Sequence, residues 1–470
     1  MRFMVLDTTK PAIAPMNNVG PNVPPTPPPA LVNDIVNTLK KNTPMKKIGT
    51  TQSIIRIFWK MEVPIASSEL FIRRLVSTPY PSPYRGGNMK KFVKTLLGCA
   101  AMMLAVACTS RAEIAEAELA QIVEKNEAVG LAVAVVKDGG IVYTGTFGYK
   151  DWENKVLWED GDVLRIASIS KSFTATSVLQ LVEAGKLSLD ADVSELMGFV
   201  IRNPKFPDTP ITVRMLLSHT SSMSDANGYF TFDNLNRETS PTWEKAWNDW
   251  EPGSKYQYCN LGFNTLGAIV EKVSGERFDE YVYNHVLAPL GVYANHNVHS
   301  LDSTRFVGIY TLDKANSTYR KSDAYPSIEE GLANYRMGYS ATLFSPTGGL
   351  KISAADLAKV MMMHMNMGTI GNVKILSPQS CELMQSEITT TNYEGERYGM
   401  ALLRTNDLLA GHRLVGHDGL ALGAHTAMFW DKDEKWGFVV MTNGCNAKTD
   451  KVFANILCES VECLYRNFIE

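Results

Sequence analysis

The stretch LRIASISKSFT, residues 164–174, decides how the rest of this 470-residue sequence is interpreted. It holds the only Ser-x-x-Lys of the chain, from Ser168 to Lys171. Apolar residues recur after it at helical spacing as far as residue 182, and Gly185 ends the run. We therefore expect Ser168 to open a long buried helix. Residues three positions apart share one face of a helix, so the Lys171 amine would point at the Ser168 hydroxyl.

Such a pair has a chemical meaning that depends on its surroundings. A serine hydroxyl is a poor nucleophile until a neighbouring base removes its proton. Lysine becomes that base when burial and the positive end of a helix dipole lower its pKa. The same tetrapeptide also fits a serine helix cap followed by a surface lysine, so Ser168 and Lys171 alone leave both interpretations open.

Two later stretches supply further polar side chains that could share a site. The sequence PGSKYQYCNLG, residues 252–262, carries Tyr258 and Asn260 at the start of a helical pattern. By itself it fits a Pro-Gly turn that leads into a helix with packed aromatic rings. The sequence GHDG, residues 416–419, carries His417 and Gly419 just before apolar, strand-like segments, although a lone His-Asp-Gly is more often a turn.

Taken in this order, the three stretches resemble the motifs of the serine β-lactamase / penicillin-binding-protein-like family, with its class C β-lactamases, D-alanyl-D-alanine carboxypeptidases and family VIII-type esterases. Residues 211–221, 346–350 and 398–400 also resemble this family, so the resemblance runs from about residue 131 to the end. It implies that Ser168 is the nucleophile and that Lys171 and Tyr258 share its proton transfer.

The resemblance also implies which residues bind the substrate. Asn260 would orient the catalytic lysine and the substrate. His417 and Gly419 would form the third motif on a strand, where Gly419 lets a substrate lie against the strand edge. The backbone N–H groups of Leu420 and Ser168 would make the oxyanion hole. The implied chemistry needs no metal and no cofactor.

The implied fold is an α/β two-lobed β-lactamase-like fold, in which an antiparallel sheet flanked by helices and an all-helical lobe enclose the active site in the cleft between them. We expect one hydrolase domain at 109–470, with the α/β lobe at about 113–192 and 345–470 and the helical lobe at about 193–344. The residue patterns predict a β-hairpin at 129–147 with an Asp-Gly turn, helices at 113–127, 261–273, 278–286, 354–367 and 452–464, and strands at 424–430 and 437–442.

The third motif bears on the substrate. Relatives with Lys-Thr-Gly at this place offer a fixed positive charge to a carboxylate, whereas a histidine such as His417 is mostly uncharged at pH 7 and Asp418 adds a negative charge. We therefore expect a small-molecule or peptide acyl substrate, and rank an esterase or D-amino-acid peptidase above an efficient β-lactamase. The alternative from another class is a catalytically silent binding or scaffold protein that keeps the fold.

The first hundred residues have a different character. Residues 1–88 are irregular and proline-rich, and we interpret them as a disordered or mis-annotated leader. At 89–108 a basic start, an apolar run and small residues before Cys108 predict an export signal, because the run is shorter than the roughly 20 residues that span a bilayer. The exported protein would be periplasmic with a free cysteine, or anchored to the outer membrane through a lipidated Cys108.

Composition excludes one class of partner. The formal net charge is −3 with acids and bases in balance, so we expect no nucleic acid as a partner. The seven cysteines are neither paired as Cys-x-x-Cys nor densely spaced. Cys445, Cys458 and Cys463 lie close enough in sequence to form one bridge, and buried free thiols are the alternative.

Overall fold

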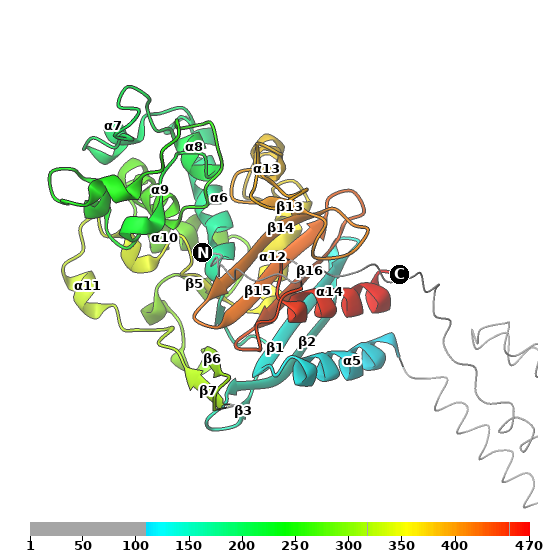
Figure 1. The fold of residues 1–470 in the computed structure, drawn as a ribbon. Helices are drawn as coiled ribbons and strands as arrows, with labels where there is room; N and C mark the ends of the chain where they lie inside the picture. Colours follow the sequence, from blue (N-terminus) through cyan, green and yellow to red (C-terminus); the bar gives the residue numbers. More distant parts are fainter. Residues whose placement is uncertain (1–109, 317, 451) are drawn as a thin grey trace, which may run out of the picture. The chain divides into compact units, whose positions relative to one another are not determined.

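The structure is a computed structural model that describes residues 110–316, 318–450 and 452–470 (Figure 1). The predicted leader at 1–88 and the predicted export signal at 89–108, with Cys99 and Cys108, lie outside the described residues. Within the described part of the chain, no helix has the length and apolar character needed to cross a bilayer.

The described residues are organised around a nine-stranded sheet in which all neighbouring strands run antiparallel. The strand order is β11-β12-β13-β14-β15-β16-β1-β2-β3, so strands from the two ends of the described chain meet in its middle. The strands are β1 (Gly130–Lys137), β2 (Gly140–Asp151), β3 (Val156–Leu157), β11 (Thr389–Thr390), β12 (Arg397–Tyr398), β13 (Leu403–Thr405), β14 (Leu414–Ala421), β15 (Ala424–Asp431) and β16 (Trp436–Thr442). This arrangement confirms the predicted hairpin and the two predicted late strands.

Alternation along β1 shows how the sheet divides two apolar cores. Leu131, Val133 and Val135 face the core beneath α5 (Arg111–Lys125) and α14 (Asn455–Phe468), which lie side by side on one face in Figure 1. The residues between them face the core that holds α12 (Ala354–Met365) on the opposite face. Because both faces are covered, β1 has the continuous apolar sequence of a fully buried strand.

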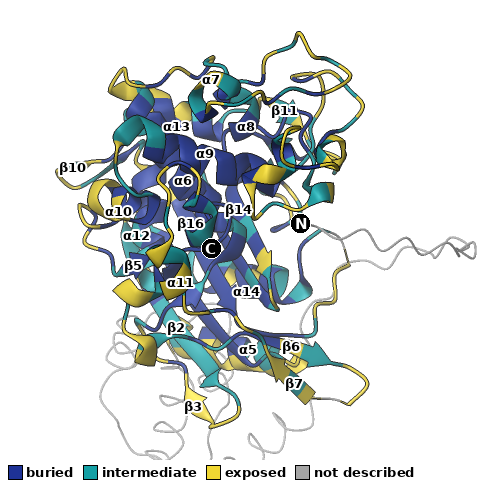
Figure 2. Cartoon of the chain, turned by 90° about the vertical axis from the view of Figure 1, so that its left-hand side faces the viewer, coloured by how far each residue is buried: buried dark blue, intermediate teal, exposed yellow. Residues whose placement is uncertain are grey.

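The second core extends into a region of helices joined by long loops. Its central helices are α6 (Ser170–Glu183) and α9 (Asn260–Ser274), which pack against each other and are drawn mostly dark blue in Figure 2 because nearly all their residues are buried. The remaining helices are α7 (Val193–Met197), α8 (Val213–Leu217), α10 (Phe278–Val282) with a π-helical continuation to Leu287, α11 (Glu329–Ala333) and α13 (Pro378–Gln385). An antiparallel sheet flanked by helices, with helices gathered beside it, confirms the predicted fold class.

One part of the predicted helical lobe lies against the sheet. The hairpin β6 (Tyr310–Asp313) and β7 (Thr318–Lys321) was not expected from the sequence, and the Tyr310 N–H donates to the Asn443 carbonyl at 2.7 Å. Two small sheets complete the strands: β4 (Leu164–Arg165), β8 (Lys351–Ile352) and β5 (Ala294–Asn295) form one, and β9 (Thr369–Ile370) with β10 (Val373–Lys374) forms the other. The lobe boundaries near 193 and 344 therefore stay approximate predictions.

Candidate active site

Ser168 lies in a short 3-10 turn, Ala167–Ile169, that leads into α6. The α-helix itself begins at Ser170, so the expectation that Ser168 opens the α-helix is corrected by two residues. Ala167, directly before Ser168, has a φ of 50°, in the left-handed region, so right-handed helical geometry begins only after it. The turn still brings Lys171 to the same side as Ser168.

The segment before the nucleophile is held on two sides. The Ile166 N–H donates to the Leu350 carbonyl at 3.0 Å, which extends the pairing of β4 with β8. The Ile166 carbonyl accepts a hydrogen bond of 2.9 Å from the Thr426 hydroxyl of β15. These bonds fix the backbone next to Ser168 to the large sheet.

The Lys171 amine is fully buried and directed at the nucleophile. Its Nζ lies 3.2 Å from Ser168 Oγ, 2.9 Å from Asn260 Oδ1 and 2.8 Å from the Thr347 carbonyl oxygen. Burial lowers the pKa of Lys171 to about 7, because the charged form loses its hydration inside the protein. A lysine amine with this pKa is partly uncharged at neutral pH. It can therefore accept the proton of the Ser168 hydroxyl.

Tyr258 lies beside this amine. The centre of its ring is 4.7 Å from Lys171 Nζ and 4.3 Å from the ring centre of His219. His219 is buried and accepts a hydrogen bond from the Cys259 N–H at Nδ1, which holds the two rings in place just ahead of α9. The structure thus brings Ser168, Lys171 and Tyr258 together, so the three side chains lie close enough to share one site.

Asn260 is the first residue of α9 and connects three parts of the site. Its Oδ1 accepts from Lys171 and, at 2.6 Å, from the Thr347 hydroxyl. Its Nδ2 donates to an Asp225 carboxylate oxygen at 2.8 Å. The amide therefore faces the lysine with its oxygen and the carboxylate with its nitrogen.

The third motif lies on β14, on the other side of the nucleophile turn. β13 pairs with β14 only as far as Gly416, and beyond that point β14 contacts the turn that carries Ser168. A side chain at Gly419 would overlap the Ile166 carbonyl oxygen, so a glycine is needed there for close approach of the protein's own backbone. Leu420 follows and is an exposed residue.

His417 is buried and hydrogen-bonded on both ring nitrogens. Its Nδ1 faces the Asp418 carbonyl oxygen, and its Nε2 lies 3.2 Å from the Tyr398 hydroxyl. Burial raises the pKa of Tyr398 well above its ordinary value, so this hydroxyl keeps its proton.

Three residues of the site were missed in the sequence. Thr347 and His219 stand in stretches that resemble the family but had no role assigned to them, and Asp225 lies in a loop without any recognised pattern. All three act through contacts between segments far apart in the chain. Distance in sequence is the reason that no local pattern indicated them.

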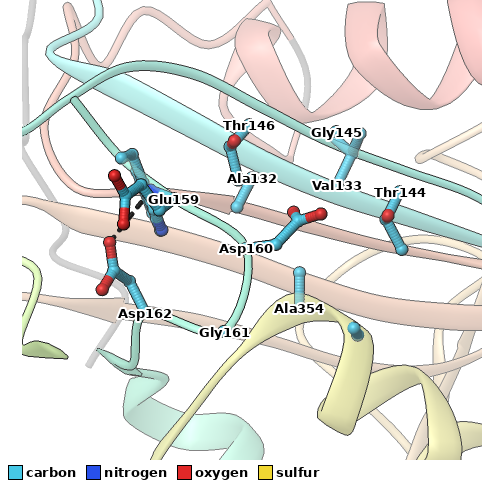
Figure 3. Close-up of a pocket in the computed structure, with 12 residues that line it drawn as sticks. Ala132, Val133, Thr144, Gly145, Thr146, Glu159, Asp160, Gly161, Asp162 and Ala354 are labelled. Atoms are coloured by element: carbon cyan, nitrogen blue, oxygen red, sulfur yellow. Dashed lines mark hydrogen bonds between the residues drawn. The ribbon is translucent and has the colours of Figure 1, made fainter.

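Other hollows and ligand-like groups in the described residues lie apart from this cluster. The cavity in Figure 3, of about 10 Å³, is lined by β1, β2, the 159–162 loop and the start of α12, and it holds one water at most. His412, Asp431 and Glu434 have ligand atoms within 4.8 Å of one another. Asp431 pairs with Leu414, at the end of β14 away from Gly419, and its Oδ1 already accepts two backbone N–H groups.

Comparison with known proteins gives relatives of both sequence and structure. Protein flp of Staphylococcus aureus (strain MRSA252) is 25% identical over 325 residues, which are 68% of this chain and 60% of that protein. The chain thus spans less than two thirds of that relative's length. The octameric penicillin-binding protein homologue from Pyrococcus abyssi is 26% identical, with a TM-score of 0.60 and 74% and 76% of the two chains covered.

A D-amino acid amidase from Ochrobactrum anthropi SV3 shares the fold at 20% identity, with a TM-score of 0.58 and 75% and 98% of the chains covered. The model of the family described as Beta-lactamase matches residues 115–457, well over half of the chain. The matched range encloses the Ser168 turn, α9 and β14, which carry the three motifs. The chain belongs to the Beta-lactamase family.

Proposed function

We propose that this protein is a serine hydrolase that forms an acyl-enzyme on Ser168. The observation that carries the proposal is the buried Lys171 amine, with a pKa of about 7, at 3.2 Å from Ser168 Oγ. A base with a pKa near the working pH is partly free to accept a proton and still able to return it.

The residues support a two-step acyl transfer. Ser168 Oγ attacks the substrate carbonyl carbon while its proton passes to Lys171, directly or through the Tyr258 phenol. The carbonyl oxygen becomes an oxyanion that the backbone N–H groups of Ser168 and Leu420 would stabilise. The leaving group departs with the proton, and the same base then removes a proton from water, whose oxygen attacks the acyl-enzyme and releases the acid.

Esters and amides of D-amino-acid type are the substrates we favour over β-lactams. The third motif carries a histidine where related motifs carry a lysine, and the Asp418 carboxylate lies 4.0 Å from His417 Nδ1, so the motif offers a carboxylate no fixed cation of its own. The fold shared with a D-amino acid amidase is compatible with this choice. The competing proposal is a binding or scaffold protein without catalytic activity. It does not account for a lysine amine that is buried next to the Ser168 hydroxyl.

Covalent labelling tests the proposal. The full chain is incubated with a fluorophosphonate and, in parallel, with a chromogenic cephalosporin and a chromogenic ester. We expect a mass increase on Ser168, because phosphonylation needs only the activated hydroxyl. We also expect slow cephalosporin turnover, because the third motif has no fixed cation for the carboxylate of the β-lactam. Ser168→Ala should abolish the adduct, whereas Ser172→Ala, in the same buried segment, should retain it.

Each other result has a defined meaning. Cephalosporin turnover as fast as ester turnover would make the enzyme a β-lactamase and contradict the substrate ranking. An adduct that survives Ser168→Ala would remove Ser168 from the nucleophile role. A well-folded chain that neither labels nor turns over substrate would favour the scaffold protein.

A further inference from the structure

Asp225 contacts the active site from a loop of the helical region. It begins a 3-10 turn, Asp225–Asn227, and its carboxylate faces the first turn of α9. Oδ2 accepts from the backbone N–H and the Nδ2 of Asn260, at 2.9 and 2.8 Å. Oδ1 accepts from the Leu261 N–H at 2.9 Å and faces the Cys259 thiol at 3.4 Å. One side chain therefore satisfies two of the free N–H groups at the start of this helix.

These hydrogen bonds determine the orientation of the Asn260 side-chain amide. The oxygen and nitrogen of an asparagine amide are almost equal in shape, so only hydrogen bonding distinguishes its two orientations. With Nδ2 bound to Asp225, Oδ1 must face the Lys171 amine and the Thr347 hydroxyl. The reverse orientation would direct the two amide N–H donors at the lysine amine and the Thr347 hydroxyl, and would leave the Asp225 carboxylate facing an oxygen.

The Asp225 charge acts on the same amine. Among the groups near Lys171 that oppose the effect of burial, Asp225 has the largest influence on the lysine pKa. The titratable groups that face this amine are Asp225 from its loop, Tyr258 and Cys259 from the segment before α9, Asp418 from β14 and His219 from the segment after α8. Removing the Asp225 charge would lower the lysine pKa further, since burial would then be less opposed.

We propose that Asp225 is a positioning residue for the hydrolysis: it fixes the Asn260 amide so that its oxygen holds the Lys171 amine at Ser168. The inference rests on the proposed function. Asp225 itself does not contact Ser168, because its carboxylate bonds to Asn260, Leu261 and Cys259.

The test compares Asp225→Asn, which removes the charge, with Asp225→Glu, which keeps the charge but moves the carboxylate. Asp233→Asn is the matched control, because Asp233 is an exposed carboxylate whose side chain accepts from the Thr231 and Thr239 hydroxyls of its own loop. The rate constant for phosphonylation of Ser168 in the full chain is measured from pH 5 to 9, with thermal melting of each variant.

We expect Asp225→Asn to slow phosphonylation about 10- to 100-fold at its optimum, as misplacement of a catalytic group by about 1 Å does. Its acidic limb should move to lower pH, because the lysine pKa falls. Asp225→Glu should be slower than the unchanged protein while its acidic limb stays in place. A purely structural role would lower stability without moving the limb, and Asp233→Asn should change neither.

An Asp225→Asn protein with the original rate and pH profile would overturn the inference. If that variant is unfolded at the assay temperature, Asp225→Glu decides alone: an unchanged rate overturns the inference, and a reduced rate with an unshifted limb supports it. Failure of the proposed function is recognised separately, because then the unchanged protein does not label or labels without Ser168.

Discussion

Replacement of Gly419 by alanine tests how tightly β14 is held against the nucleophile. The new Cβ would overlap the Ile166 carbonyl oxygen and the Thr426 hydroxyl oxygen, and would lie 3.1 Å from Ala167 Cβ. Non-bonded carbon atoms are comfortable at about 3.5–4.0 Å, so β14 and the nucleophile turn must separate by about 1 Å. Such overpacking costs about 1–3 kcal/mol of unfolding free energy. The same displacement moves Ser168 and should slow acylation about 100-fold.

Urea unfolding and the rate of fluorophosphonate labelling measure the two effects. Gly140→Ala is the matched control in the same sheet, because its Cβ would meet nothing closer than the Lys137 carbonyl oxygen at 4.0 Å. That variant should label at the original rate. If Gly419→Ala were as stable and as fast as the control, the close approach of β14 to the nucleophile turn would be wrong, and glycine would be needed there only for the substrate.

Two further predictions concern buried lysines. With a Lys171 pKa of about 7, the rate of Ser168 phosphonylation should rise about tenfold from pH 6 to pH 8 and then level off, and a flat profile over that range would exclude the lysine as the base. Lys351 is buried and its pKa is lowered well below the ordinary value, so above that lowered pKa the folded protein holds fewer protons than the unfolded chain. The contribution of Lys351 to the unfolding free energy should therefore increase as the pH rises toward the ordinary lysine pKa, because the unfolded chain still holds this proton. Urea unfolding of Lys351→Met at a series of pH values should lack this contribution, and equal pH slopes in the two proteins would contradict the lowered lysine pKa.

The sequence predicted the parts of the structure that local patterns determine. The hairpin at 129–147 follows from an apolar run, an Asp-Gly turn and an alternating strand, and the structure has Asp138 and Gly139 at positive φ between β1 and β2. The helices at 261–273 and 354–367 follow from apolar spacing. The approach of Lys171 to Ser168 needs only a helical turn, so it too was accessible from the sequence.

The parts that were missed depend on contacts across the chain. Asp225 meets α9 about 35 residues later, and Thr347 meets Lys171 across a separation of 176 residues. The β6–β7 hairpin is largely polar, so its alternation gives little signal, and its place is set by hydrogen bonds such as that of Tyr310 to Asn443. The 3-10 turn at Ser168 depends on the left-handed Ala167, which no residue preference indicates.

The pairing of β1 with β16 has a consequence for how the molecule is made. Leu131 pairs with Thr442, so β1 lacks this neighbouring strand until β16, about 300 residues later in the sequence, has been synthesised. Non-local pairing of this kind slows folding and leaves a strand edge open to other chains in the meantime. The Ser168 turn is synthesised early, but β14 and β15, which hold it in shape, arrive some 250 residues later. A nascent chain that ends before β14 therefore carries the Ser168 turn without these contacts, so the geometry of the proposed active site forms only after β14 and β15 have been synthesised.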